Sequence, residues 1–244
     1  MRVPSASRLL DAWELGLAQG PVQRALTLLA AGSPESSRDD LAARPIGQRD
    51  RELAALRELL FGSRLPLLGR CPACGESVEC VLSTAELKGA GTPEGDEAEG
   101  IAEIEGYRIA YRPPTSVDLL ALVPGDPAAL RGQLLARCVR GAHDAGGAVD
   151  ADRLPSHVVA GLVEAIAQAD PDGDVTLDLT CTACAHRWDE ALDIADVLWR
   201  EVHAWAQRTV RDVHTLARSY GWREADVLAL SPARRHMYLE LSQL

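Results

Sequence analysis

Long apolar runs are missing from this chain of 244 residues. No stretch approaches the roughly 18 to 20 uninterrupted apolar residues that a membrane-spanning helix requires, so we expect no membrane insertion. Residues Met1 to Pro4 lead into an amphipathic segment and not into the apolar core of a signal sequence. The sequence therefore predicts a soluble, cytoplasmic protein.

Positive charge is also scarce. The chain has 25 Lys and Arg residues against 36 Asp and Glu residues, which gives a formal net charge of −11. No basic cluster is long enough to reverse this balance locally, and an acidic surface repels phosphate backbones. We therefore expect no nucleic acid among the main partners.

The short motifs of common enzyme classes are absent as well. The chain contains no G-x-x-x-x-G-K-[ST], G-x-G-x-x-G, G-x-S-x-G or H-E-x-x-H pattern. Residues 170–174 superficially suggest a calcium loop, but the glycine is misplaced and Cys181 stands where the closing glutamate belongs. The six histidines are scattered and form no recognisable triad. The sequence thus predicts that the protein is not an enzyme and has no catalytic residues.

What the chain does contain is helical periodicity over much of its length. The first 30 residues predict a short helical pair that is broken at Gly20-Pro21. A helix is expected from Asp50 to Phe61, closed by Gly62, and a long helix from Ala195, closed by Gly221. Three residues are placed to cap following helices, namely Ser37, Asp126 and Ser231.

Strand-like alternation is confined to short segments. Residues 77–84 and Tyr107 to Tyr111 each predict a half-buried strand, and the segment from Val175 through Trp188 predicts a hairpin. Residues 88–105 are rich in Gly, Glu and Asp and nearly devoid of apolar side chains, which favours a loop. Residues 141–152 are expected to form another loop.

Together these patterns predict an α+β fold that is mostly helical. We expect an interrupted four-cysteine zinc ribbon with an inserted helical subdomain and a long C-terminal helix. We call a C-x-x-C turn a knuckle. The predicted segments are a helical segment at 1–36, a helix and the first knuckle at 37–88, and an inserted acidic loop, strand and helices at 89–173. They continue with a hairpin that carries the second knuckle at 174–194 and a helical segment at 195–244.

The chemistry of the sequence lies in two C-x-x-C turns, Cys71–Cys74 and Cys181–Cys184. Two residues between cysteines let both sulfurs point to one side of a tight turn, and two such turns offer four thiolates to a tetrahedral zinc ion. The separation is unusual, since 106 residues, 75 to 180, lie between the turns. Four thiolates close the coordination shell, so we predict a structural Zn²⁺ held by Cys71, Cys74, Cys181 and Cys184.

Other roles for these cysteines remain open at this point, namely disulfides, a redox pair or buried thiols without a ligand. A cytoplasmic chain disfavours disulfides, and a redox C-x-x-C is expected singly at the start of a helix. His186 and Cys80 are close enough in sequence to replace a ligand. We expect a solvated or hydrogen-bonded histidine and a buried strand cysteine instead, and the same burial for Cys138.

Aromatic residues are few, but half of them fall in the last 46 residues. Trp205 and Tyr220 fit the apolar stripe of the long helix and are expected in the core. Trp199, Trp222 and the pair Arg234-Arg235 fall off that stripe and are the predicted interface residues, because aromatic and arginine side chains are favoured at protein interfaces.

The order of several motifs resembles a known family. The quoted segments are Pro45–Asp50, Leu56, Arg57 and Leu60, Phe61-Gly62, the CxxCG knuckle at Cys71, Tyr107–Thr115 with Asp118, Thr180–Cys184, His186–Trp188, Tyr220–Asp226 and Leu230–Pro232. This set, over residues 40 to 244, is similar to small baseplate hub assembly proteins of contractile-tailed phages. It also resembles relatives in phage-derived extracellular contractile injection gene clusters.

The resemblance implies a non-enzymatic role in building or joining a baseplate, with hub, spike or sheath-proximal proteins as partners, and incorporation in a phage tail-like particle. A second reading is a zinc-ribbon regulatory module that acts on transcription or translation machinery. That reading predicts basic knuckles, whereas Glu76, Glu79, Asp178, Asp189 and Glu190 flank them.

Overall fold

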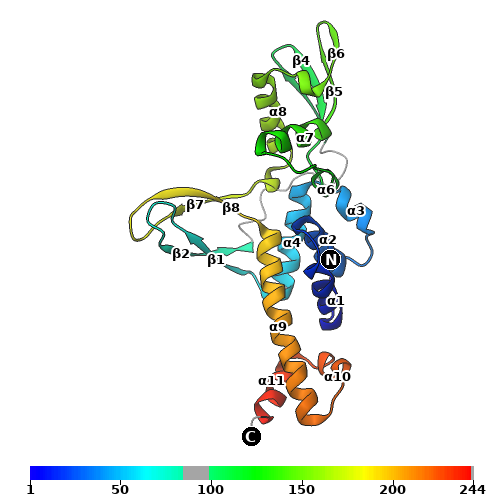
Figure 1. The fold of residues 1–244 in the computed structure, drawn as a ribbon, viewed down its shortest axis with the longest axis vertical. Helices are drawn as coiled ribbons and strands as arrows, with labels where there is room; N and C mark the ends of the chain where they lie inside the picture. Colours follow the sequence, from blue (N-terminus) through cyan, green and yellow to red (C-terminus); the bar gives the residue numbers. More distant parts are fainter. Residues whose placement is uncertain (85–98, 243–244) are drawn as a thin grey trace. The chain divides into compact units, whose positions relative to one another are not determined.

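A computed structural model describes residues 1–84 and 99–242 of the protein. Helices make up most of its regular structure, and the strands form small antiparallel sheets, so the fold is α+β (Figure 1). The chain divides into two compact units. Unit 1 comprises Met1–Ser36 and Ile194–Leu244, and unit 2 comprises Ser37–Asp193.

All the regular secondary structure that is described in unit 1 is helical. Its helices are α1 (Ala6–Leu17), α2 (Pro21–Gly32), α9 (Ile194–Tyr220), α10 (Glu224–Leu228) and α11 (Pro232–Leu241). The predicted long helix is therefore present as α9, and α1 and α2 both pack against it. Leu28, Leu198 and Leu216 lie fully buried in this unit.

The helix ends follow the predicted capping chemistry. Ser37 accepts a hydrogen bond from the Asp40 N–H at 3.1 Å, and Asp126 accepts one from the Ala129 N–H at 2.8 Å. Ser231 likewise accepts from the Arg234 N–H at 3.3 Å. Gly62 and Gly221 follow helices with φ of 89° and 72°, a conformation that glycine adopts without strain. These five predicted boundaries are confirmed.

Unit 2 alternates short helices with hairpins. Its helices are α3 (Arg38–Ala43), α4 (Ile46–Phe61), α6 (Ser116–Leu120), α7 (Pro127–Cys138) and α8 (Ser156–Ala169), with 3₁₀ turns η2 (Ala151–Arg153) and η3 (Pro171–Gly173). Its strands are β1 (Arg64–Arg70), β2 (Ser77–Ser83), β3 (Gly100–Ile104), β4 (Tyr107–Tyr111), β5 (Val139–Asp144), β6 (Gly147–Val149), β7 (Thr176–Thr180) and β8 (Arg187–Ala191).

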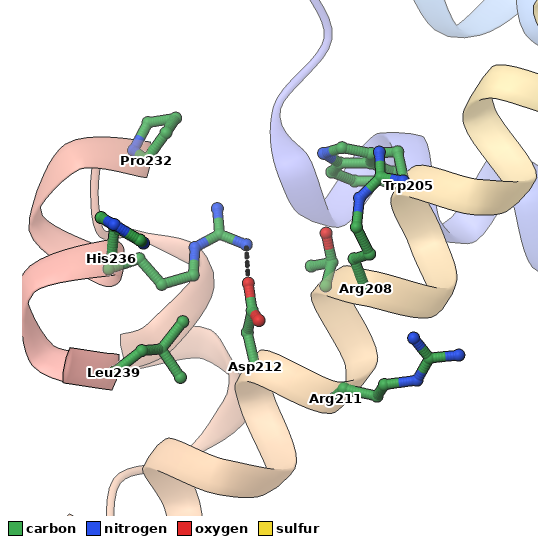
Figure 2. A pocket seen from close by; sticks show the side chains of 9 residues that line it. Trp205, Arg208, Arg211, Asp212, Pro232, His236 and Leu239 are labelled. Carbon is green, nitrogen blue, oxygen red and sulfur yellow. Dashed lines mark ion pairs between the residues drawn. The ribbon is translucent and has the colours of Figure 1, made fainter. Parts of the chain in front are cut away.

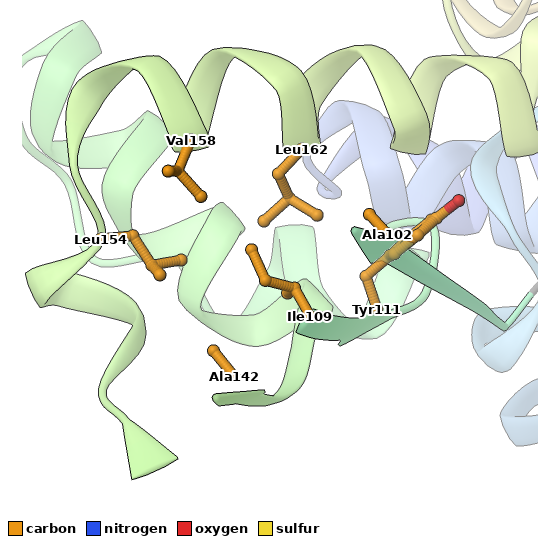
Figure 3. Packing of buried hydrophobic residues seen from close by; sticks show 7 residues of the cluster. All are labelled: Ala102, Ile109, Tyr111, Ala142, Leu154, Val158 and Leu162. Carbon is orange, nitrogen blue, oxygen red and sulfur yellow. The ribbon is translucent and has the colours of Figure 1, made fainter. Parts of the chain in front are cut away.

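The segment between the two knuckles contains the predicted strand, as β4, and predicted helices, as α7 and α8, but it is less helical than the subdomain that we predicted. Its strands form a four-stranded antiparallel sheet in the order β3-β4-β5-β6, and α8 packs against β3 and β4. Ile109 on the sheet and Val158 and Leu162 on α8 are fully buried at the centre of this layer (Figure 3). The inserted segment therefore has its own α+β core.

Two predicted loops contain parts of this sheet. Residues 88–98 of the acidic loop lie outside the described residues, but residues 100–104 form β3, and the predicted loop at 141–152 contains most of the β5–β6 hairpin and η2. Both strand segments are short and lie beside glycines and acidic residues. The average composition of each predicted loop segment therefore concealed the strand signal. Ala102 and Ala142 supply the buried contacts, and alanine gives only a weak strand signal.

The strand β1 was also not predicted, because Pro66 and Gly69 interrupt its alternation. It pairs with β2 along its whole length, from Arg64 opposite Ser83 to Arg70 opposite Ser77. In a two-stranded sheet each strand is an edge, and an edge tolerates a proline that cannot donate a ladder hydrogen bond.

Two of the quoted sequence motifs meet at the start of α4. Pro45 forms a β-bridge with Thr115, and the Ile46 N–H donates to the Pro114 carbonyl at 3.0 Å. The Gly47 N–H donates to Asp170 Oδ2 at 2.8 Å. These bonds connect α4, the segment before α6 and the segment before η3 within unit 2.

Candidate metal centre

Each C-x-x-C turn is the tip of a two-stranded antiparallel hairpin. β1 and β2 carry Cys71 and Cys74, and β7 and β8 carry Cys181 and Cys184. The second hairpin is the one predicted from the alternation that begins at Val175. Hairpin tips place the two sulfurs of each turn at the end of a paired, regular backbone.

The two turns share one hydrogen-bonding pattern. The Gly75 N–H donates to the Cys71 carbonyl and the Ala185 N–H to the Cys181 carbonyl, both at 2.9 Å. The Cys71 N–H donates to the backbone carbonyl of Glu76, and the Cys181 N–H donates to the backbone carbonyl of His186, again both at 2.9 Å. The turns therefore present their sulfurs from matching backbones.

The residue after each turn has a left-handed backbone. Gly75 has φ of 76°, and Ala185 has φ of 57°. Glycine adopts this conformation freely, whereas an L-residue with a Cβ is strained by roughly 1 to 2 kcal/mol. The turn geometry is thus kept at Ala185 even though the side chain opposes it.

The four sulfurs converge. All lie within 4.8 Å of one another, with 3.7 Å between the sulfurs of Cys71 and Cys184 and 3.6 Å between those of Cys74 and Cys181. Metal–sulfur bonds of about 2.3 Å in a tetrahedron place sulfurs about 3.8 Å apart, whereas a disulfide needs about 2.05 Å. The four cysteines are therefore positioned to hold a metal ion, and all of them are free thiols.

Backbone amides around the site favour a thiolate. Burial alone raises the pKa of Cys71, but hydrogen bonds from the backbone of Cys74 and Ala73, with those of the neighbouring thiols, outweigh it and lower the pKa to about 7. A backbone hydrogen bond from His186 lowers the pKa of Cys184, but burial and the contacts with the sulfurs of Cys71 and Cys181 outweigh it and raise this pKa. Without a cation, the site favours ionisation of one cysteine and disfavours further ionisation. A bound cation would favour the thiolate form of all four.

The site is half buried. Cys71 and Cys181 are 2% and 1% exposed and pack with Val78, and Trp188 packs against this small cluster. Cys74 and Cys184 lie at the surface. Four sulfurs complete a tetrahedral shell, so a metal held here has no open position for water or substrate. Such a centre suits bracing the two hairpins and not catalysis.

The side chains of His186 and Cys80, the two residues considered as substitute ligands, and that of Cys138 are not part of the sulfur cluster. His186 is exposed and stacks on Trp188, with ring centroids 6.2 Å apart and planes inclined by 13°. Cys80 is half-buried in β2 opposite Leu67, and Cys138 is buried at the end of α7. Among the described residues, the four knuckle cysteines are the one group placed for a metal.

Two of the predicted interface residues are largely buried within unit 1. Trp199 is 8% exposed and covers Gly16, while the Arg24 guanidinium lies 4.6 Å from its ring centroid. Arg235 is 7% exposed and faces Asp212. Leu198, Val202, Thr209 and Leu216 of the predicted stripe are buried, and the covered face of α9 extends to Trp199 because α1 and α2 both pack against this helix.

The other two predicted interface residues lie nearer the surface. Arg234 is exposed on α11, and Trp222 is half-buried, stacked on Tyr220 and edge-on to Tyr238, with ring centroids 4.8 Å away in each case. We predicted that Tyr220 and Trp205 lie in the core, but Tyr220 is 39% exposed and Trp205 is only half-buried.

Sequence reasoning singled out neither Arg208 nor Arg211, which line a groove beside Trp205. The three residues follow one another at intervals of three along α9, and this spacing was the available signal, since it puts side chains on one helix face.

Over the residues that the structure describes, no helix has both the length and the apolar character needed to cross a bilayer. Comparison of the chain with protein-family models, curated proteins and solved structures finds no match.

Proposed function

We propose that the protein is a non-enzymatic structural component whose four-cysteine centre holds one Zn²⁺. The observation that carries this proposal is the convergence of four sulfurs within 4.8 Å from two separate hairpins. All-thiolate tetrahedral sites are typical of structural zinc, and zinc when bound supplies a rigid cross-link with no redox chemistry.

The hairpins need such a cross-link. An isolated two-stranded hairpin is at best marginally stable in water. The buried cluster that joins the two hairpins consists of Cys71, Val78 and Cys181 with Trp188 packed against it, and this apolar area is small. Gly69 brings the β1 backbone close to Leu179 and Trp188, which aligns the hairpins but adds little burial. Metal binding by the four thiolates would therefore supply much of the free energy that holds the two hairpins together.

We propose further that this braced scaffold acts in building or joining the baseplate of a contractile tail or injection machine, with hub, spike or sheath-proximal proteins as partners. The ordered motifs over residues 40 to 244 support this assignment. Two of those motifs, at Pro45–Asp50 and Tyr107–Thr115, contact each other through the Pro45–Thr115 bridge, so they serve one structural junction. A closed metal shell is also consistent with a scaffold and not with a catalyst.

The zinc part is tested by elemental analysis of the purified chain. We expect one zinc per chain, lost on exhaustive chelation and absent from the Cys71→Ser/Cys181→Ser variant. The Cys80→Ser/Cys138→Ser variant is the matched control, because it removes two cysteines that lie outside the cluster. A chain purified without any bound transition metal would end the proposal.

The assembly part is tested by capture from a lysate that expresses an intact gene cluster of this kind. A tagged full-length chain should retain hub, spike or sheath-proximal proteins, as identified by mass spectrometry. Retention of RNA polymerase or ribosomal proteins in their place would support the zinc-ribbon regulatory module. The exposed acids Glu76, Glu79, Asp189 and Glu190 around the knuckles count against that outcome.

A further inference from the structure

A groove of about 420 Å³ lies between α9 and α11 in unit 1 (Figure 2). Trp205, Arg208 and Asp212 line it from α9, and His236 and Leu239 line it from α11. Its volume lies within the range of about 300 to 1,000 Å³ that ligand pockets occupy. Every lining residue belongs to one compact unit, so the groove is a property of that unit alone.

The groove is positively charged although the protein is acidic. Arg208, Arg211 and Arg235 line it together with one acid, Asp212, which gives 3 − 1 = +2 with His236 neutral. The whole chain carries −11. Concentrated charge of the minority sign marks a surface that attracts a ligand of opposite charge.

One of the arginines that line the groove, Arg235, has a hydrogen-bond donor without a partner. Arg235 is 7% exposed, and its Nε is buried with no hydrogen-bond partner. Its contact with Asp212, drawn as a dashed line in Figure 2, is 3.8 Å long and therefore too long for a hydrogen bond. A buried guanidinium with an unused donor is costly, and a carboxylate beside the guanidinium would offset part of this cost through its charge.

The walls of the groove are apolar. Trp205 is half-buried on one side, and Pro232 and Leu239 lie on the other (Figure 2). A purely ionic ligand would leave these surfaces wet, whereas a large apolar side chain next to a carboxylate would cover them. Tryptophan and arginine together are the residue types that most often dominate binding at interfaces.

We infer that this groove binds an acidic segment of a partner protein, with carboxylates at its arginines and an apolar side chain against Trp205. This inference rests on the proposed function and names the chemistry of the partner. A carboxylate is favoured over a phosphate for two reasons. Asp212 within the groove opposes a doubly charged group, and the acidic chain around it repels a long polyanion.

The test uses the full-length, zinc-loaded chain and fluorescence anisotropy. The probe is a labelled pool of short peptides in which glutamate or aspartate flanks one leucine or tryptophan. A second pool has glycine in place of the apolar residue, and a single-stranded oligothymidylate is the phosphate probe. We expect saturable binding of the first pool, weaker binding of the glycine pool and the weakest binding of the oligonucleotide.

The variant Arg208→Glu/Arg211→Glu should weaken binding of the first pool by roughly tenfold or more, because each change replaces a charge-assisted contact with repulsion. Both side chains are exposed, so the fold should tolerate the changes. Arg200→Glu is the control, since it alters an exposed arginine of α9 that pairs with Asp196 and does not line the groove. This control should bind as the unmodified chain does.

Three results would overturn the inference. The first is the absence of saturable peptide binding up to about 1 mM, the weak limit of useful affinity. The second is unchanged affinity for the peptides in the double variant. The third is tighter binding of the oligonucleotide than of the peptides. If the peptides fail while the chain still captures baseplate proteins and zinc, the groove inference alone falls. If capture and zinc fail while peptide binding persists, the proposed function falls instead.

Discussion

The sulfur of Cys74 lies 3.6 Å from the sulfur of Cys181, although 107 positions separate the two residues in sequence. A contact that closes so long a loop has a large entropic cost, and the small apolar cluster around it offers little to offset that cost. The metal ion that we propose at the four sulfurs would strengthen this contact.

Replacing Cys74 by serine should accordingly release the hairpins. With one ligand lost, we expect zinc to fall well below one per chain and the hairpin joint to weaken by at least about 3 kcal/mol, since structural zinc binding is coupled to local folding. Limited proteolysis should then cut within residues 64–83 and 176–191. Cys80→Ser should keep both its zinc and its protease resistance, because Cys80 lies outside the sulfur cluster. Equal cleavage of the two variants would show that the metal does not hold the hairpins.

The strained turn at Ala185 leads to a prediction of opposite sign. Ala185→Gly should stabilise the protein by about 0.5 to 1 kcal/mol, because relief of the left-handed strain exceeds the entropy that glycine adds to the unfolded chain. Gly75→Ala at the equivalent position should destabilise by a similar amount. No atom lies within 4 Å of the added Cβ there, so the effect reports the backbone alone. Urea unfolding of the zinc-loaded chains measures both values, and a destabilised Ala185→Gly would contradict the strain argument.

The cysteine site was predictable from sequence because each C-x-x-C turn is a local structure whose geometry does not depend on distant residues. The long helix was predictable for a similar reason, since its periodicity runs over many turns. Its orientation was not. Trp199 is buried because Gly16 on α1 leaves room for the indole, and a glycine on another helix is invisible to the periodicity of α9. The same holds for Ala102 and Ala142, whose small side chains supply buried strand contacts without a strong strand signal.

The close approach of Gly47 to the turn before β7 predicts a large effect from one methyl group. A Cβ at Gly47 would clash with Asp170 Oδ1 and would lie 2.7 Å from the Gly173 nitrogen. Gly47→Ala should therefore cost about 2 kcal/mol or more, because α4 must move and its hydrogen bond to Asp170 must lengthen. Gly132→Ala in α7 is the matched control. It meets nothing within 4 Å and should stabilise its helix by up to about 1 kcal/mol. Similar thermal unfolding midpoints for the two variants would rule out a tight junction.

The ion pair between Arg112 and Asp118 predicts how acid affects stability. Burial raises the pKa of Asp118, but two hydrogen bonds from Arg112, at 2.6 and 2.8 Å, and those from Thr115 outweigh it and hold the pKa below its usual value of 3.8. The folded state thus favours the charged carboxylate. Its contribution is fully present above the unfolded pKa and is lost as the pH falls through the lower folded pKa.

Asp118→Asn should lower the free energy of unfolding by about 2 kcal/mol at pH 7, because it leaves the Arg112 charge without its partner. The same change should flatten the decline in stability below about pH 4, since the variant has no such carboxylate to protonate. Asp126→Asn is the control, because asparagine caps a helix as well as aspartate does and Asp126 is exposed. Urea unfolding at a series of pH values separates these effects. An unchanged acid slope in Asp118→Asn would mean that Asp118 gains nothing from Arg112 in the folded protein.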